Sequence, residues 1–243
     1  MSRLPRAIAV GYPHHVTQRG NHHQTVFSEA GDYSRYLNWL AQYTEKYGFE
    51  VWAYCLMPNH VHLVGVPGSG DSLARAFNTV HMKYAQDYNR RNGETGHLWQ
   101  GRFFSCVLDE RHTYAAIRYV EMNPVRGGLC GRPEDYPWSS ARAHMAGIQP
   151  PPLSGQCPLL KTVGNWREYL SPAGLDGAGS VTTGRDAAGQ DTAEWDAVVK
   201  ATQNGHPCGP EDFVRRMEGI LGRTFAIRPR GRPRSGSGKD GPP

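Results

Sequence analysis

Met57-Pro58-Asn59-His60-Val61-His62-Leu63-Val64 is a turn followed by an alternating apolar run that carries two histidines two residues apart. Residues i and i+2 of a β-strand point to the same face, so His60 and His62 lie side by side, about 6–7 Å apart at the backbone. Neutral imidazole is a common ligand of divalent metals. Val61 and Leu63 face the other way and can anchor the strand in a core. The pair fits a metal site, or two strand histidines satisfied by their neighbours, because so short a motif also arises by chance.

The residues around this stretch predict alternating strands and helices. Aromatic and β-branched runs favour strands, whereas apolar residues at spacings of three and four favour helices. The expected strands are 14–19, 49–56, 60–66 and 103–108, and the expected helices are 32–47, 73–91 and one that starts after Asp109 and ends at Met122 or Asn123, because Pro124 follows. This order predicts an α+β, ferredoxin-like sandwich, an antiparallel sheet with helices on one face. The other face would stay open, as in many nucleic-acid platforms.

The sequence changes character after about residue 150. We expect one domain over 1–150, a linker with short helices over 151–222 and a poorly ordered basic tail over 223–243. Residues 174–189 are mostly Gly, Ala, Thr and Asp with little to bury, whereas 193–202 and 211–221 favour short amphipathic helices. In the tail, Arg230, Arg232 and Arg234 alternate with Gly and Pro, as in an AT-hook core that binds the A·T minor groove.

Composition restricts the partners and the compartment. The net charge is +5, which suggests an anionic partner such as nucleic acid. No apolar run is long enough to span a bilayer, and the first residues do not resemble a signal peptide, so we expect no membrane association. The five cysteines are scattered and odd in number, which is typical of reduced thiols in the cytoplasm.

A second candidate cluster lies in the helix expected after Asp109. Tyr119 and Asn123 are four residues apart, so a phenol and a side-chain amide share one helical face. If that face packs near the histidine strand, His60, His62 and Asn123 could bind a metal beside Tyr119 as nucleophile. Tyrosine is a weak nucleophile unless a metal or a base assists it. Taken alone, Tyr119 would be a packed or surface tyrosine.

Five blocks occur in order along the first 145 residues: HHVTQRGN at 14–21, AYCLMPNHVHLV at 53–64, LWQGRF at 98–103, RYVEMNPVR at 118–126 and YPWSS at 136–140. Together they resemble the HUH-type single-tyrosine transposases, which carry IS200-like transposase domains. The resemblance is strongest to the branch associated with repetitive extragenic palindromes (REP). It covers roughly residues 5–145, and no block after residue 150 matches.

The resemblance implies a specific chemistry. Such enzymes have a ferredoxin-like fold and cut single-stranded DNA near hairpins, forming a 5′-phosphotyrosine intermediate. Carried over, the nucleophile is Tyr119, and the ligands of Mg²⁺ or Mn²⁺ are His60, His62 and Asn123. Many relatives have Gln in the third-ligand role, so Asn123 departs from the pattern by one methylene. The implied setting is DNA transposition and recombination by a cytoplasmic, nucleoid-associated protein, either monomer or homodimer.

Candidate DNA contacts are spread along the chain. Arg19, Lys83 and Arg126 suit phosphate contacts, Trp99, Gln100 and Arg102 suit base stacking and backbone contacts, and Arg230, Arg232 and Arg234 suit the minor groove. For the cations the alternative is a solvated surface, and for Trp99 it is the core. His14, His15, His22 and His23 could touch phosphate or metal, or be ordinary strand and loop histidines.

Two other functions remain open at this level. The chain could be a non-catalytic single-stranded nucleic-acid-binding module of the same fold. It could also be a small metallohydrolase that uses the histidine pair alone, which would leave Tyr119 without a role. The presence of His60, His62, Tyr119 and Asn123 together favours the nuclease and transposase.

Overall fold

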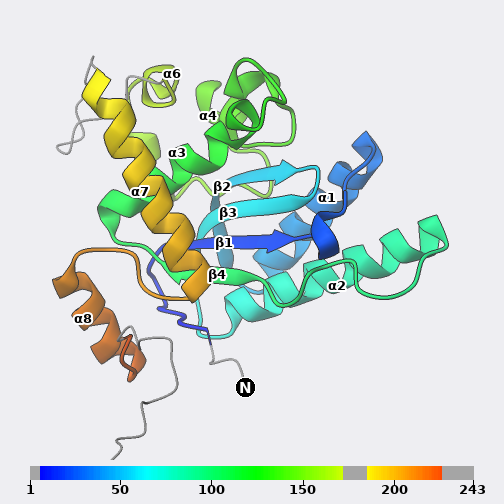
Figure 1. Ribbon diagram of the computed structural model, residues 1–243, viewed down its shortest axis with the longest axis horizontal. Helices are drawn as coiled ribbons and strands as arrows, with labels where there is room; N and C mark the ends of the chain where they lie inside the picture. Colours follow the sequence, from blue (N-terminus) through cyan, green and yellow to red (C-terminus); the bar gives the residue numbers. More distant parts are fainter. Residues whose placement is uncertain (1–5, 172–184, 226–243) are drawn as a thin grey trace, which may run out of the picture.

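The computed structural model describes residues 6–171 and 185–225, with side chains for 6–171 and 192–225. Its centre is a four-stranded antiparallel sheet in the order β2-β3-β1-β4 (Figure 1). The strands are β1 (His14–Arg19), β2 (Phe49–Met57), β3 (His60–Pro67) and β4 (Phe104–Val107). Three long helices accompany them: α1 (Ala30–Lys46), α2 (Ser72–Asn92) and α3 (Glu110–Arg126). The β-α-β-β-α-β order with this strand arrangement is ferredoxin-like, so the predicted α+β class is confirmed.

Each strand sends alternate residues to opposite faces of the sheet. Val61 and Leu63 join a core with α1 and α2, whereas Val64 joins a second core with α3. The expectation of helices on one face only is therefore wrong. Helix α3 packs on the second face, and α7 (Arg185–Asn204) crosses α3 and the side of the sheet formed by β1 and β4 (Figure 1). The face that carries the histidines is thus covered, and the site lies between layers.

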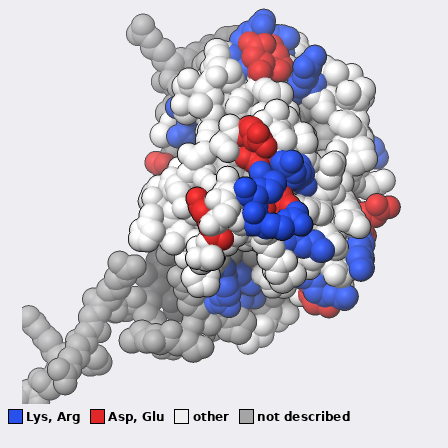
Figure 2. All heavy atoms as spheres, turned by 90° about the vertical axis from the view of Figure 1, so that its right-hand side faces the viewer, with Lys and Arg blue, Asp and Glu red and all other residues white. Residues whose placement is uncertain are grey.

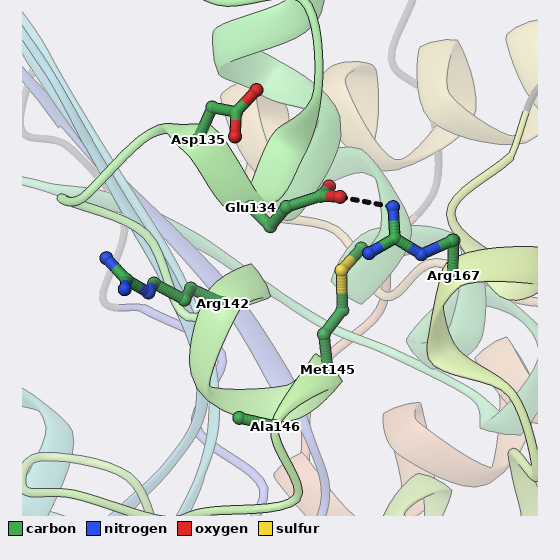
Figure 3. A pocket seen from close by; sticks show the side chains of 6 residues that line it. All are labelled: Glu134, Asp135, Arg142, Met145, Ala146 and Arg167. Atoms are coloured by element: carbon green, nitrogen blue, oxygen red, sulfur yellow. Dashed lines mark hydrogen bonds and ion pairs between the residues drawn. The ribbon is translucent and has the colours of Figure 1, made fainter.

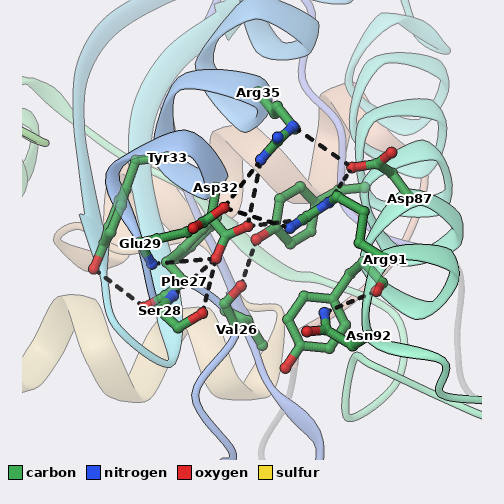
Figure 4. A network of polar contacts seen from close by, with 12 residues as sticks. Val26, Phe27, Ser28, Glu29, Asp32, Tyr33, Arg35, Asp87, Arg91 and Asn92 are labelled. Atoms are coloured by element: carbon green, nitrogen blue, oxygen red, sulfur yellow. Dashed lines mark hydrogen bonds and ion pairs between the residues drawn. The ribbon is translucent and has the colours of Figure 1, made fainter.

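A buried carboxylate joins α1 to α2. Asp32 accepts hydrogen bonds from the backbone N–H and the hydroxyl of Ser28 at 2.9 and 3.0 Å, and it lies 2.7 Å from Arg91 Nη2 (Figure 4). Arg91 also contacts Asp87 at 2.8 Å, and Arg35 lies beside both carboxylates. Burial alone would raise the pKa of Asp32, but the hydrogen bonds and the Arg91 charge outweigh it and lower the pKa.

Helix α3 starts where the sequence predicts but ends later than expected. Asp109 caps it as predicted, with its carboxylate accepting from His112 N–H at 2.8 Å. The helix does not stop before Pro124 but continues to Arg126. Proline removes one N–H donor and crowds the carbonyl of the preceding turn, but the helix continues past it, with Gly127 N–H bonding to the Asn123 carbonyl at 2.8 Å. The last turn therefore holds Asn123 in helical geometry.

The YPWSS block packs along the outside of β2. Leu56 N–H bonds to Trp138 O and Ser140 N–H bonds to Tyr54 O, both at 2.9 Å. The fully buried Glu121 of α3 accepts from Ser140, from His144 at 2.6 Å and from Trp166 Nε1 at 2.7 Å. The role of this block among the described residues is therefore to fix α3 against the sheet.

The boundary expected at residue 150 does not separate two units. Leu159, Trp166 and Val198 belong to the same buried cluster as the β2 and α3 side chains. Helix α7 begins at Arg185, inside the segment expected to be a linker. The remaining short helices that the structure describes are η1 (Asn21–His23), η2 (Pro133–Asp135), α4 (Ala141–Met145), α5 (Leu159–Thr162) and α6 (Trp166–Tyr169).

The C-terminal part also packs on the core. Helix α8 (Glu211–Leu221) matches the expected helix, and its Phe213 and Met217 form a small cluster with Phe225 and Val107. The packed chain thus extends at least to Phe225, beyond the expected boundary at 223. The AT-hook-like Arg230, Arg232 and Arg234, and most of the segment 174–189, lie outside the described residues. Among the helices that the structure describes, none is long and apolar enough to cross a membrane.

Candidate active site

The two histidines lie side by side at the start of β3, as the strand period predicts. Their ring centroids are 4.9 Å apart, with the ring planes nearly perpendicular. His60 is half-buried, whereas His62 is 6% exposed. Antiparallel pairing with β1 places Arg19 opposite His60 and Thr17 opposite His62.

Each imidazole uses the same nitrogen for a hydrogen bond to the protein. His60 Nδ1 lies 2.6 Å from Asn59 Oδ1, and His62 Nδ1 lies 3.0 Å from Nε2 of His15 on β1. The amide oxygen can only accept, so His60 donates from Nδ1. With Nδ1 engaged in this way, Nε2 is the nitrogen of each ring that remains for a metal ion.

The surroundings keep both rings neutral. Burial lowers the pKa of His60 to about 4, assisted by the positive charges of Arg19 and His23. Burial also lowers the pKa of His62 well below its usual value, with further contributions from the neighbouring histidines, Arg19 and Arg126. A neutral imidazole is the form that coordinates a metal.

Tyr119 faces the histidine pair from α3. Its ring centroid is 5.3 Å from that of His62 and 6.0 Å from that of His15, and its side chain is 9% exposed. The Arg126 guanidinium lies 5.2 Å from the centre of the Tyr119 ring and 4.7 Å from that of Trp195 on α7. The phenol therefore sits between the histidines, a cation and an aromatic ring.

Asn123 lies one turn after Tyr119 on the same helical face. Its Nδ2 donates to the Tyr119 carbonyl oxygen at 3.0 Å, so the amide oxygen is directed away from this bond. Within the described residues, no group of three or more His, Cys, Asp or Glu side chains could hold a metal ion. A third protein ligand would have to be another residue type, such as an amide.

These residues fit a divalent cation. Two neutral imidazoles whose Nδ1 atoms are already engaged, together with an amide on the helix turn after Tyr119, are donor types that Mn²⁺ or Mg²⁺ can accept, with the remaining positions left to phosphate and water oxygens. His60, His62 and Asn123 would hold such an ion.

Part of the expected DNA surface lies at the same end of the sheet. Arg19 and Gln100 are exposed neighbours, because Gln100 N–H bonds to the Arg19 carbonyl at 2.9 Å. Arg102 is exposed in the loop before β4. In residues 6–171 and 192–225, Arg19 and Arg126 form no ion pair with a carboxylate, so both charges are available to an anion.

Two of the expected contacts lie elsewhere. Trp99 is 8% exposed, packs on Tyr36 and Tyr84 in the α1–α2 core and donates from Nε1 to the His81 carbonyl at 2.9 Å. Lys83 lies on α2, 5.7 Å from the Tyr43 ring of α1, in the helix layer behind the sheet. Trp99 is therefore a core residue, and Lys83 does not line the site.

Charges at the end of the molecule where β1 and α2 finish are mixed rather than of one sign (Figure 2). Arg90 lies 2.5 Å from Asp87, and Arg35 lies 3.5 Å from Glu29. Pairing of this kind reduces the attraction of these cations for a nucleic acid. Arg19 forms no ion pair with a carboxylate among the described residues, so its attraction for a nucleic acid is not reduced in this way.

A surface pocket lies apart from the histidines. It is lined by Glu134, Asp135, Arg142, Met145, Ala146 and Arg167 (Figure 3). Arg167 forms an ion pair with Glu134 across it. Its lining includes neither Tyr119 nor the histidines, so this pocket is separate from the candidate active site.

Three contributors to the site escaped the sequence-based prediction. His15 was foreseen only as one of several strand or loop histidines, whereas Thr202 and Trp195 were not foreseen at all. Both lie on α7, seven residues apart and therefore on one helical face.

His22 and His23 lie in η1 with φ of 48° and 60°, a left-handed conformation that is uncommon outside glycine.

Comparison with known proteins agrees with this geometry. Residues 10–123 match the family model described as Transposase IS200 like. The histidine pair, Tyr119 and Asn123 all lie within the stretch that is similar to this transposase family.

The names of individual relatives indicate one branch of this transposase family. A protein of Haemophilus influenzae named "Putative REP-associated tyrosine transposase" is 28% identical over 136 residues, covering 51% of this chain and 77% of that protein. The REP-associated tyrosine transposase of Escherichia coli is 24% identical over 105 residues, covering 42% of this chain and 61% of that protein. A solved REP-associated tyrosine transposase bound to a REP hairpin is 21% identical, with a TM-score of 0.49 over 64% of this chain and 93% of that one. The two sequence relatives confirm the resemblance to the REP-associated branch.

Proposed function

We propose that this chain cuts and rejoins single-stranded DNA at hairpins, with Tyr119 as the nucleophile and a divalent cation held by His60, His62 and Asn123. The observation that carries the proposal is the approach of the Tyr119 ring to within 5.3 Å of the His62 ring, across the contact between α3 and β3. A binding module has no need of a phenol beside two neutral imidazoles. The family match and the names of the relatives support the same conclusion.

The reaction is an exchange of phosphate esters. The Tyr119 oxygen attacks the phosphorus in line, and a bond forms between them as the bond to the 3′ oxygen breaks. The phenol loses its proton and the leaving 3′ oxygen gains one, which yields a 5′-phosphotyrosine and a free 3′-OH. Bound Mg²⁺ or Mn²⁺ would polarise a non-bridging phosphate oxygen and stabilise the departing oxygen. Attack by another 3′-OH on the phosphotyrosine reverses the step and joins strands.

The protein contributes charge and position. Arg19 and Arg126, unpaired with carboxylates in the described part of the chain, attract the phosphate and balance its growing negative charge. The Arg126 guanidinium over the Tyr119 ring also restricts where the phenol can move. Helix α3, fixed through Glu121, holds the phenol rigidly against the sheet.

The hairpin substrate and the setting follow from the relatives rather than from a contact. The relatives are named for repetitive extragenic palindromes, and a palindromic strand can fold back into a hairpin. We therefore propose single-stranded DNA with a hairpin as the partner, with nicking and rejoining as steps of transposition and recombination.

Replacement of Tyr119 by Phe tests the nucleophile. Tyr119→Phe removes only the hydroxyl, so we expect it to abolish the covalent adduct while DNA affinity stays within about twofold, since binding rests on other contacts. The measurement is incubation with single-stranded hairpin oligonucleotides and Mn²⁺, followed by a denaturing gel.

Tyr114→Phe is the matched control. Tyr114 lies on the same helix, but its hydroxyl contacts Thr162 at 3.2 Å instead of the histidines. This variant should form the adduct at the wild-type rate. A 5′-linked adduct in Tyr119→Phe would refute the assignment, and DNA binding by the wild-type protein without any adduct would favour a non-catalytic module.

A further inference from the structure

A chain of buried polar contacts leads from His62 to helix α7. His62 Nδ1 lies 3.0 Å from His15 Nε2, and His15 Nδ1 lies 2.7 Å from the Thr202 hydroxyl. That hydroxyl donates to the carbonyl oxygen of Val198, one turn earlier, at 2.7 Å. The side chains of His15 and Thr202 are each 1% exposed. We call these four groups the His62 chain.

The direction of each hydrogen bond follows from counting protons. The Val198 carbonyl can only accept, so the Thr202 hydroxyl gives its single proton to it. The hydroxyl must then accept from His15, which places the His15 proton on Nδ1. A neutral imidazole has one protonated nitrogen, so His15 Nε2 is an acceptor and His62 Nδ1 is the donor to it. His62 is left with an unprotonated Nε2.

Cys106 agrees with this direction. Its sulfur lies 3.1 Å from the Thr202 hydroxyl, and burial raises the pKa of the thiol to about 12, so the thiol is protonated and can donate. The hydroxyl then accepts twice and donates once, which satisfies it fully. A buried network with every member satisfied has one preferred arrangement.

We propose that Thr202 and His15 are positioning residues that fix the tautomer of His62, so that its Nε2 is free to bind the divalent cation. This inference rests on the proposed function, because it concerns the same metal site. It also makes α7, which lies outside the matched residues 10–123, a working part of that site. His60 needs no such chain, since its neighbour Asn59 accepts from Nδ1 directly.

The histidine tautomers of the metal-free, full-length protein give the first test. Nitrogen-15 chemical shifts and long-range couplings of the imidazoles show which nitrogen carries the proton. We expect His62 and His15 both to be protonated at Nδ1 in the wild-type protein. His62 protonated mainly at Nε2 would overturn the proposal without any variant.

Variants of Thr202 give the second test. Thr202→Val keeps the shape but removes the hydroxyl, so His15 loses its acceptor and its proton can move to Nε2, which would then repel His62 Nδ1–H. We expect Mn²⁺ affinity, measured by electron paramagnetic resonance, to fall about 10-fold or more, as for other partners of metal-bound histidine. Thr202→Ser keeps the hydroxyl, so this variant should bind Mn²⁺ with wild-type affinity.

Cys106→Ala is the matched control. It removes the other neighbour of the same hydroxyl while leaving the chain to His15 intact, so both the tautomers and the Mn²⁺ affinity should stay at wild-type values. Wild-type tautomers and affinity in Thr202→Val would overturn the proposal. Loss of affinity in Thr202→Val, without any DNA adduct from the wild-type protein, would uphold the positioning role and refute the proposed nuclease instead.

Discussion

At the scale of single residues, the two histidines of the pair reach the same protonation pattern by different means. His60 uses an adjacent side chain, Asn59, whereas His62 uses a residue on another strand, His15. Both rings are neutral and donate from Nδ1. The shared consequence is a pair of Nε2 atoms suited to one ion, and removal of either ring leaves a single imidazole.

Removing either imidazole should therefore stop metal-dependent cleavage. We expect His60→Ala and His62→Ala each to reduce the adduct rate more than about 100-fold at fixed Mn²⁺, because a ligand is lost directly. EDTA should stop the wild-type reaction, which a time course of adduct formation would show. His97→Ala, at an exposed loop histidine, is the control and should react normally. Full activity in chelator would contradict the metal site.

Trp99 gives a prediction of the opposite kind. It was expected to be a possible DNA contact, but it is buried among Tyr36, Tyr84 and His81. Trp99→Ala should lower the free energy of unfolding by about 3–5 kcal/mol, as for other large aromatic truncations in cores. Denaturant titration would measure this, with the exposed neighbour Gln100→Ala as control. A change below 1 kcal/mol, on the order of a surface substitution, would contradict the core placement.

At the scale of elements, local periodicity explains which parts of the site could be predicted. The strand period brings His60 and His62 to one face, and the helix period does the same for Tyr119 and Asn123. Each relation spans four residues or fewer, so the sequence contains it. The packing of α3 against that face was supplied by the family resemblance, not by periodicity.

What the sequence did not reveal depends on long-range packing. His15 and Thr202 are 187 residues apart, and no pattern in either segment indicates that they meet. An aromatic residue such as Trp99 suits a core or a base-stacking surface equally well until its neighbours are known. The expected helix end before Pro124 was wrong, because proline disfavours a helix locally but this helix is held by its packing and continues to Arg126.

Asp32 tests how α1 is fixed at its start. It accepts from Ser28 and pairs with Arg91 of α2, so Asp32→Ala leaves the partly buried Arg91 without this partner and removes half of the capping box that Asp32 forms with Glu29. We expect a loss of about 2 kcal/mol or more in the free energy of unfolding. Asp71→Ala, at the start of α2, is the matched control. The Asp71 side chain is 62% exposed, so its removal should change the free energy of unfolding far less than Asp32→Ala does. Equal losses in the two variants would contradict the buried role of Asp32.

At the scale of the whole molecule, both faces of the sheet are occupied and several histidines are buried without charge. His14 is fully buried and His81 is 6% exposed. Burial lowers the pKa of His14 to about 4 and that of His81 to about 3, from the usual 6.5. Below pH 6.5 the unfolded chain therefore binds protons that the folded chain does not.

Stability should accordingly decline as the pH falls. Each such histidine contributes stability that is fully present above pH 6.5 and is lost as the pH falls from there toward its folded pKa, by up to about 1.4 kcal/mol per pH unit. Denaturant titrations of the metal-free protein between about pH 6.5 and 5, above the usual carboxylate range, would measure the slope. His81→Gln, which keeps an acceptor for the Tyr36 hydroxyl, should show a smaller slope than the wild type. An identical slope would contradict the neutral buried state of His81.

The 187-residue separation of His15 and Thr202 also orders events during translation. At about 5–20 residues per second, a ribosome needs roughly 10–40 s to reach Thr202 after making His15. The sheet, α3 and Tyr119 are complete long before that moment. For this interval the growing polypeptide has Tyr119 and both imidazoles of the proposed site but not the hydroxyl that contacts His15, so the proposed site would be completed only once α7 has been synthesised.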